Sequence, residues 1–305
     1  MRILRNPTGM QPCVLVLGMF DGVHRGHQAL LMAGVELAEA TGLPLNVCTF
    51  EPHPMQVLRP DMAPPLLTTL TERARLMAEF GVDHLCILAF SKEKAAQSPE
   101  DFMEAMVRDY QPRHVVCGFN FTFGYRGAGN GESLRAYGAE HGFDVTIVPE
   151  VVLGGETVSS TRIRSLLQQG RIHEATRLLG HSYTLSGRVM DGKHIGRTMG
   201  YPTANVEIPA GKALPAFGVY ACWMQVEERI YPAVVNVGRH PTLPEGSVTV
   251  EAYVLDECLS LYGKKVRLLF LDFLRPEKKF NGVEELKGQI DRDAQEAREF
   301  FEEMQ

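Results

Sequence analysis

Short apolar runs alternate with helical patterns over the first 180 residues of the chain. Each run is almost continuously hydrophobic, which is typical of a strand buried on both of its faces. The intervening stretches repeat their apolar positions as helices do, and one of them opens on Ser98 and Pro99, a favoured helix start. This alternation predicts an α/β domain with a doubly wound parallel sheet. The expected strands are residues 13–18, 44–50, 84–90, 113–118 and 143–148, and the expected helices are 26–42, 70–81, 98–110 and 131–142.

The pattern changes after two more helical stretches, 159–170 and 171–180. Strand-like runs then follow one another with glycine and proline between them, which predicts a small antiparallel β-barrel. We therefore expect two domains, 1–181 and 182–305. From Gly282 the apolar positions step by three or four, which predicts a C-terminal amphipathic helix. The expected barrel strands are 183–190, 200–206, 218–226, 229–238, 247–256 and 264–274.

Composition narrows the class of protein. The chain has 305 residues, of which 45% are hydrophobic and 22% charged, and its formal net charge is −6. This balance argues against a protein that coats nucleic acid. No apolar run reaches the length of about 18 residues that a membrane span needs, and the N-terminus lacks signal-peptide features. None of the six cysteines is spaced as C-x-x-C, so we expect buried free thiols in a cytoplasmic protein.

The stretch "GMFDGVHRGHQALL" (18–31) follows the first predicted strand and enters the first helix. His24 and His27 share a helix face, and the N–H groups and dipole of a helix N-terminus favour an anion. Gly18, Gly22 and Gly26 allow the backbone to approach a ligand closely. The pattern therefore predicts a phosphate site. One alternative is that these are incidental polar residues on the first turn of a helix. Another is a pair of zinc ligands, although zinc-binding helices favour His at i and i+4 and no third ligand is evident.

A second candidate is "SSTRIR" (159–164), which precedes an apolar helical run. Its hydroxyls and backbone N–H groups stand at another predicted helix start, and Arg162 and Arg164 can hold phosphate through two parallel hydrogen bonds. The alternative is an ordinary Ser/Thr N-cap with solvated arginines.

Together these motifs resemble the nucleotidylyltransferase superfamily. More closely, nearly the whole chain resembles the bacterial bifunctional riboflavin kinase/FMN adenylyltransferases, or FAD synthetases. The most specific match is "GYPTAN" inside a predicted barrel strand. The resemblance implies a Rossmann-like N-terminal domain and a kinase barrel. Other matching stretches are "TFEPHP" (49–54), "GFNFTFGYRGAGN" (118–130), "VVNVGRHPTL" (234–243), "VEAYVLD" (250–256), "LYGKKVRLLFLDFLRPEKKF" (261–280) and "LKGQIDRD" (286–293).

The resemblance implies that the first domain joins FMN to AMP from ATP, giving FAD and pyrophosphate. The FMN phosphate is already ionised at pH 7, so this step needs charge stabilisation rather than a strong base. His24, His27 and Arg164 match the catalytic positions. Asn120 matches a position near the flavin or the adenylyl site, and its alternative is an ordinary turn Asn. The expected ATP-binding set is Gly18, Phe20, Gly22, His24, His27, Ser159, Ser160, Thr161 and Arg164.

The resemblance also implies that the barrel phosphorylates riboflavin with ATP to give FMN. A ribityl hydroxyl is a poor nucleophile, so a placed carboxylate is useful. Glu251 matches the family's catalytic Glu. It lies on the strand face opposite Val250 and Ala252, and the alternative interpretation is a solvated residue on the outer face of the barrel. Thr203 and Asn205 match the Mg²⁺–ATP positions, since oxygen ligands suit Mg²⁺. The loop around 187–200 adds Gly196, Arg197 and Gly200 for the ATP phosphates.

Three positions depart from the usual family pattern: Asp191, Leu243 and Tyr253. None of them is an expected catalytic residue. The main alternative function is a relative that retains only one of the two activities. A tRNA-charging enzyme and a flavin-binding regulator with degraded sites fit less well, because the barrel lacks a basic aromatic stripe and His27, Thr203, Asn205 and Glu251 are all present. We expect small-molecule substrates and no nucleic-acid or membrane partner, and the sequence leaves the oligomeric state open.

Overall fold

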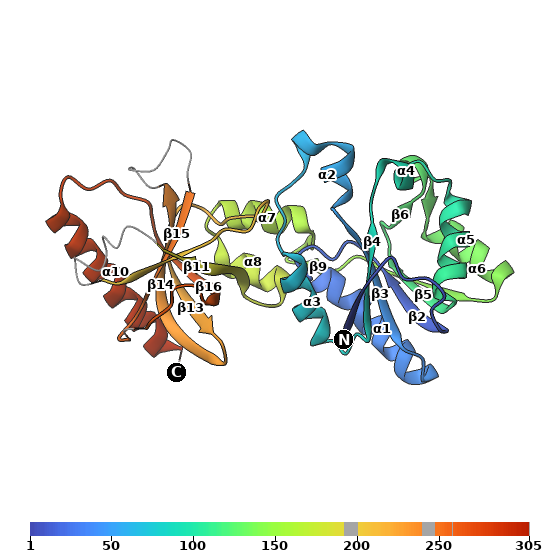
Figure 1. Cartoon of the computed structure of the whole chain (residues 1–305), viewed down its shortest axis with the longest axis horizontal. Coiled ribbons are helices and arrows are strands. Elements are labelled where there is room, and N and C mark those ends of the chain that lie inside the picture. Colours follow the sequence, from blue (N-terminus) through green and yellow to red (C-terminus); the bar gives the residue numbers. More distant parts are fainter. Residues whose placement is uncertain (192–200, 240–247, 258, 305) are drawn as a thin grey trace. The chain divides into compact units, whose positions relative to one another are not determined.

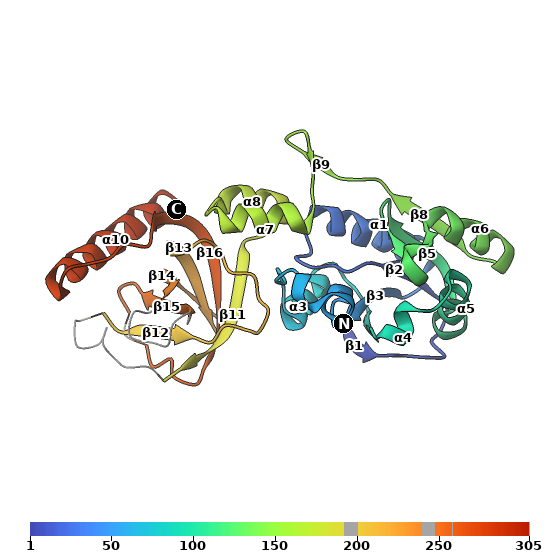
Figure 2. The same cartoon turned by 90° about the horizontal axis from the view of Figure 1, so that it is seen from above.

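The computed structural model describes residues 1–191, 201–239, 248–257 and 259–304. Its contacts divide the chain into two compact units, Met1–Ser159 and Ser160–Gln305. Figures 1 and 2 show the elements of each unit from two directions. Within the described ranges, no helix has the length and apolar character needed to cross a membrane.

The first unit is built on a six-stranded parallel sheet. Its order is β1-β4-β3-β2-β5-β8, and all five predicted strands are present. The sixth, β1, lies at the edge and is mostly exposed, and the sequence analysis did not predict it. By contrast, every residue of β2 is buried. The strands are β1 (Arg2–Arg5), β2 (Cys13–Leu17), β3 (Leu45–Glu51), β4 (His84–Ala89), β5 (Pro112–Gly118) and β8 (Asp144–Val148).

Helices cover both faces of this sheet, so the doubly wound fold is confirmed. Val14 and Val16 of β2 pack with α1 (Arg25–Thr41) and α3 (Leu70–Ala78). The alternate residues of β2 pack with α5 (Pro99–Tyr110) and α6 (Gly131–His141) on the opposite face. Ser98 caps α5 as expected, and Pro99 occupies its first turn. The smaller elements are α2 (Pro54–Leu58), η1 (Pro60–Met62), α4 (Lys92–Ala95), β6 (Thr122–Phe123), η2 (Tyr125–Gly127), β7 (Gly129–Asn130), β9 (Val152–Leu153) and β10 (Glu156–Thr157).

The second unit contains the predicted antiparallel barrel. Six strands close in the order β11-β12-β15-β14-β13-β16. The C-terminal helix α10 (Val283–Glu303) lies along the outside of the barrel, where Ala294, Ala297 and Phe301 pack against its strands (Figure 2). The strands are β11 (Tyr183–Met190), β12 (Thr203–Val206), β13 (Gly218–Val226), β14 (Arg229–Arg239), β15 (Val248–Val254) and β16 (Lys265–Pro276).

Two helices precede the barrel, α7 (Ser160–Gln168) and α8 (Ile172–Leu179). Both belong to the second unit by their contacts. The Leu167 carbonyl accepts a hydrogen bond from the Ala216 N–H at 2.8 Å, and His173 Nε2 lies 3.0 Å from Asp272 Oδ1 of β16. The functional boundary between 1–181 and 182–305 stays a prediction.

Candidate active sites

The loop that carries the two histidines lies where the strand order of the first sheet reverses. β2 is flanked by β3 on one side and by β5 on the other. In open α/β sheets, the crevice beyond the carboxyl ends of the strands at this switch point binds the ligand. Residues 18–24 follow β2, and Asn120 follows β5. Both segments therefore lie at the edge of the sheet where a ligand site is expected.

Buried polar contacts hold the histidine loop in an unusual backbone conformation. Phe20 and Val23 have φ values of 55° and 40°, which non-glycine residues rarely adopt. The buried Asp21 carboxylate accepts backbone N–H bonds from Leu67 at 3.1 Å and Thr68 at 3.0 Å. The Gly22 N–H donates to Thr68 Oγ1 at 2.9 Å. These contacts with the segment before α3 offset the backbone strain and fix the loop.

His24 caps the first helix with its ring. Its Nδ1 accepts the backbone N–H of His27 at 3.3 Å. A neutral His24 therefore carries its proton on Nε2. The rings of His24 and His27 stack with centroids 3.7 Å apart. Gly26 makes room for this arrangement, because a Cβ there would lie 3.2 Å from two atoms of the His24 ring.

His27 is a neutral side chain with an unused ring nitrogen. Burial, His24 and Arg73 hold the pKa of His27 well below its usual range, so it is uncharged at pH 7. Its buried Nδ1 has no hydrogen-bond partner among the described residues. Unsatisfied buried polar atoms are uncommon and often mark functional positions. A ligand at this position would meet an uncharged His27 ring, which offers hydrogen bonds rather than a full charge.

Arg73 of α3 is a buried cation beside the same loop, and the sequence analysis missed it. Its Nη1 donates to the Met19 carbonyl at 3.1 Å and to Thr49 Oγ1 at 3.3 Å. Burial lowers its pKa, whereas Asp21 and Glu51 raise it. In "LTERAR" it reads as an ordinary solvated helix residue, since only the tertiary fold buries it. Arg73 supports the backbone that leads into His24.

The other expected residues of the adenylyltransferase site lie around this loop or in the second unit. A Cβ on Gly18 would lie 3.0 Å from the Phe20 ring, so this glycine gives the ring its space. Asn120 is exposed, and its Oδ1 is 3.4 Å from the Cβ position of Gly118. The Val158 carbonyl is 3.8 Å from the Cβ position of Gly26, which brings the chain before Ser159 to the start of α1. Ser160, Thr161 and Arg164 begin α7 in the second unit, and their place beside the histidines stays a prediction.

The barrel brings the expected kinase residues onto one face through its strand register. Asn205 of β12 lies opposite Glu251 of β15, and Glu251 also lies opposite Asn236 of β14. Directly opposed residues share a face, with Cβ atoms about 5 Å apart. Thr203 is two residues from Asn205 and therefore shares that face. Asn236, inside "VVNVG", is the member that the sequence analysis did not single out.

The face that carries Glu251 is the outer face of the barrel. Its neighbours Val250 and Ala252 are fully buried in the barrel core, whereas Glu251 is half-buried. Thr249 Oγ1 lies 3.5 Å from Glu251 Oε1 on the same face. The alternation predicted from the sequence is confirmed. Gly196, Arg197, Gly200 and Leu243 lie outside the described residues.

The donor set around Asn205 suits Mg²⁺. The hydroxyl of Thr203, the amide oxygen of Asn205 and the nearby carboxylate of Glu251 are hard oxygen donors on adjacent strands. Among the described residues, no group of three His, Cys, Asp or Glu side chains could form a metal cage. This combination fits an ion that is held mainly by substrate phosphates and water and only partly by protein.

Comparison with known proteins covers both units. The FAD synthetase family matches residues 6–162, and the riboflavin kinase family matches residues 179–301. A bifunctional riboflavin kinase/FMN adenylyltransferase of Escherichia coli K12 is 38% identical over 95% of this chain and 93% of its own. The Bacillus subtilis protein of that name is 35% identical over 94% and 92%.

A solved structure shares the fold of nearly the whole chain. It is a Streptococcus pneumoniae protein described as a macrolide-efflux protein, with a TM-score of 0.88 and 31% identity over 98% of this chain and 99% of that one. The sequence relatives and both family matches cover the two units that carry these candidate sites. The chain therefore belongs to the family of bifunctional riboflavin kinase/FMN adenylyltransferases.

Proposed function

We propose that this chain makes FAD from riboflavin in two ATP-dependent steps. The barrel domain, 182–305, phosphorylates riboflavin to FMN, and the N-terminal domain, 1–181, adenylylates FMN to FAD with release of pyrophosphate. The observation that carries the proposal is that Asn205, Glu251 and Asn236 lie opposite one another on three neighbouring barrel strands. The same chain holds two stacked histidines where the strand order of the parallel sheet reverses. ATP is a substrate of both steps, so we place the enzyme in the cytoplasm.

In the adenylyl transfer, a phosphate oxygen of FMN attacks the α-phosphorus of ATP, and pyrophosphate leaves. Negative charge builds up on the oxygens around that phosphorus and on the leaving group. Nε2–H of His24 and the neutral ring of His27 donate hydrogen bonds to these oxygens. Gly18, Phe20 and Gly22 give the loop the shape that lets the phosphates approach the start of α1. The outer phosphates of ATP are bound by Ser159, Ser160, Thr161 and Arg164. Asn120 contacts the flavin.

In the kinase step, Glu251 accepts the proton of the ribityl hydroxyl while the oxygen of that hydroxyl attacks the γ-phosphorus of ATP, and ADP leaves. A carboxylate placed on the attacking hydroxyl orients it and removes the proton in the transition state. Thr203 and Asn205 hold Mg²⁺, which when bound neutralises charge on the ATP phosphates. Gly196, Arg197 and Gly200 complete the phosphate site.

The test is to follow flavin products by liquid chromatography, aerobically and with reduced flavin. The purified chain with riboflavin, ATP and MgCl₂ is expected to form FMN first and then FAD. Accumulation of FMN with no FAD under either condition would mean that only the kinase is active. No FMN under either condition would refute the kinase assignment.

Site variants should separate the two steps. His27→Ala is expected to stop FAD formation and leave FMN formation intact, with His141→Ala, an exposed residue at the end of α6, as its control. Glu251→Gln is expected to stop FMN formation and leave adenylylation of added FMN intact, with Glu228→Gln, in an exposed turn, as its control. If Glu251→Gln phosphorylated riboflavin at the native rate, its role as base would be wrong.

A further inference from the structure

A hydrogen bond joins the helix outside the barrel to the start of the strand that carries Thr203. The hydroxyl of Tyr201 donates to Asp291 Oδ1 of α10. Tyr201 stands two residues before Thr203. This bond raises the pKa of Tyr201 to about 12. The contact thus ties β12 to an element 90 residues away in sequence.

The Tyr201 ring also contacts the face that carries the kinase residues. Its ring meets Tyr253 edge-on, with centroids 5.6 Å apart and planes at 84°. Tyr253 lies directly opposite Thr203 and two residues from Glu251. Tyr253 in turn packs against the apolar cluster that α10 forms with the barrel. Tyr201 therefore lies between the helix and the row of site residues.

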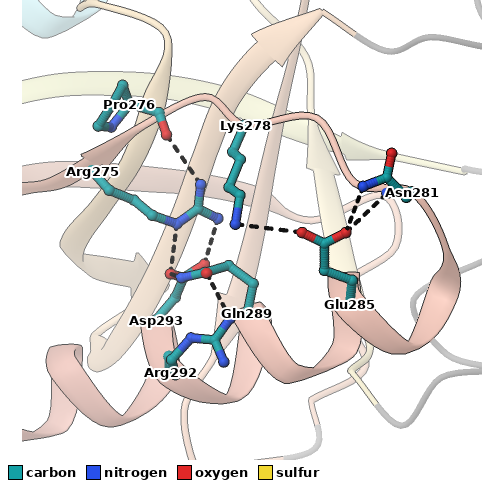
Figure 3. Close-up of polar contacts among 8 residues, drawn as sticks. All are labelled: Arg275, Pro276, Lys278, Asn281, Glu285, Gln289, Arg292 and Asp293. Atoms are coloured by element: carbon teal, nitrogen blue, oxygen red, sulfur yellow. Dashed lines mark hydrogen bonds and ion pairs between the residues drawn. The ribbon is translucent and has the colours of Figure 1, made fainter.

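The part of α10 around Asp291 is firmly attached to the barrel. Arg275 of β16 makes two hydrogen bonds to the buried Asp293 carboxylate, at 2.7 and 2.6 Å (Figure 3). Gln289 Nε2 donates to the same carboxylate at 2.8 Å. Bidentate Arg–carboxylate pairs fix geometry as well as adding energy. Asp291, two residues away on the helix, is therefore a fixed acceptor.

The start of β12 is attached to the barrel through β15. β11 pairs with Asn205 and Val206 at the C-terminal end of β12. The pairing with β15 includes Thr203. The hydrogen bond from Tyr201 to Asp291 adds a second attachment two residues before Thr203.

We propose that Asp291 and Tyr201 are positioning residues of the kinase site. Their hydrogen bond fixes the start of β12 and thereby the Thr203 hydroxyl and the Asn205 amide that face the nucleotide. The inference rests on the proposed function, since it takes Thr203 and Asn205 as the groups that hold the metal–nucleotide.

The direct test is Tyr201→Phe, which keeps the ring against Tyr253 and removes only the hydroxyl. The probe is MgADP, titrated calorimetrically into the whole chain with saturating FAD, the product that occupies the first site. Loss of one hydrogen bond to a charged acceptor corresponds to about a tenfold effect. We expect the Kd of MgADP and the KM of MgATP to rise about tenfold, with kcat for phosphorylation changed less and FMN adenylylation unchanged.

The Asp291 variants separate positioning from general packing. Asp291→Asn keeps an acceptor oxygen and is expected to bind MgADP nearly as the native chain does, whereas Asp291→Ala should match Tyr201→Phe. The double variant Tyr201→Phe with Asp291→Ala should be no worse than either single one, because both remove the same bond. Glu302→Ala, an exposed acid on the same helix, is the control and should change nothing.

The outcomes distinguish failure of this inference from failure of the proposed function on which it rests. Native MgADP affinity in Tyr201→Phe, or additive losses in the double variant, would overturn the positioning role. Thr203→Ala is run alongside. If it leaves MgADP affinity unchanged, the assignment of the nucleotide site fails, and the inference fails with it. If Thr203→Ala weakens binding and Tyr201→Phe does not, only the inference fails.

Discussion

Gly26→Ala should impair FAD formation without unfolding the protein. Gly26 lies in the first turn of α1, between the two stacked histidines. The added Cβ would lie 3.2 Å from Cε1 and Nδ1 of His24, so that ring must move by a few tenths of an ångström. His24 cannot move freely, because it is 6% exposed and its Nδ1 holds the His27 N–H. The displacement therefore reaches both imidazoles.

Two opposing effects set the change in stability. Alanine is favoured over glycine inside a helix by about 1 kcal/mol. Weakening the cap that His24 gives to α1 costs about 1 kcal/mol. The net change in the free energy of unfolding is therefore within about 1 kcal/mol of zero. Catalysis has no such compensation, since misplacing groups by about 1 Å can cost 10²-fold. A shift of a few tenths of an ångström is expected to lower kcat/KM for adenylylation about tenfold.

The assay compares FAD formation from FMN and ATP with riboflavin phosphorylation by the same preparation, together with thermal unfolding. Gly282→Ala is the matched control, because its backbone is extended, with φ of −176°, and no atom lies within 4 Å of the added Cβ. Adenylylation at the native kcat/KM in Gly26→Ala would refute the reasoning that the precise ring positions matter. A parallel loss of kinase activity would show instead that the substitution acts through global unfolding.

Three further predictions concern charge and packing. The pKa of His27 is lower in the folded protein than in the unfolded chain, so its contribution to stability is complete above pH 6.5. Below pH 6.5 that contribution is lost by about 1.4 kcal/mol per pH unit until the folded pKa is passed. Between pH 7.5 and 5.5, the Tm of His27→Gln should therefore depend less on pH than the Tm of the native chain. Arg275→Met removes the cation from the buried Asp293 carboxylate and leaves it only the Gln289 hydrogen bond, so it should lower the unfolding free energy of the second unit by about 3 kcal/mol, measured by denaturant unfolding. Replacing both Arg275 and Asp293 with leucine should restore most of that loss. Gly34→Ala places a Cβ 2.6 Å from Val16 Cγ2 and should destabilise the first unit by about 1–2 kcal/mol despite the better helix propensity, as a lower Tm with retained kinase activity would show.

Features that depend on neighbouring residues in sequence could be predicted. The continuous apolar run of β2 indicated a fully buried strand, and Ser98 with Pro99 marked the start of α5. In β15, strict alternation placed Glu251 on the face opposite Val250 and Ala252. The hydrophobic pattern of the two strands reflects burial directly, and the helix start depends only on adjacent residues, so one sequence was enough.

Features that depend on the packing of distant segments could not be predicted from the same patterns. β1 is an edge strand of four mostly exposed residues, and its two apolar residues between arginines are too short a run to indicate a strand. Arg73 is buried only because α3 packs beside the loop before His24. Asn236 lies opposite Glu251 because of the register between β14 and β15. Hydrophobic alternation does not fix that register, since a shift by two residues leaves the same side chains on each face. Functional residues of this kind require the fold before they can be named.

The two sites differ in how their chemistry depends on the fold. The adenylyltransferase histidines are three residues apart, and one helix start sets their geometry. Glu251 and Asn205 meet only through the register of β12 and β15, and β12 has four residues. The kinase site therefore depends on whatever holds that short strand, which here includes α10 through Tyr201. Changes on the outside of the barrel should consequently affect FMN formation, whereas FAD formation from FMN depends on the turn that begins α1.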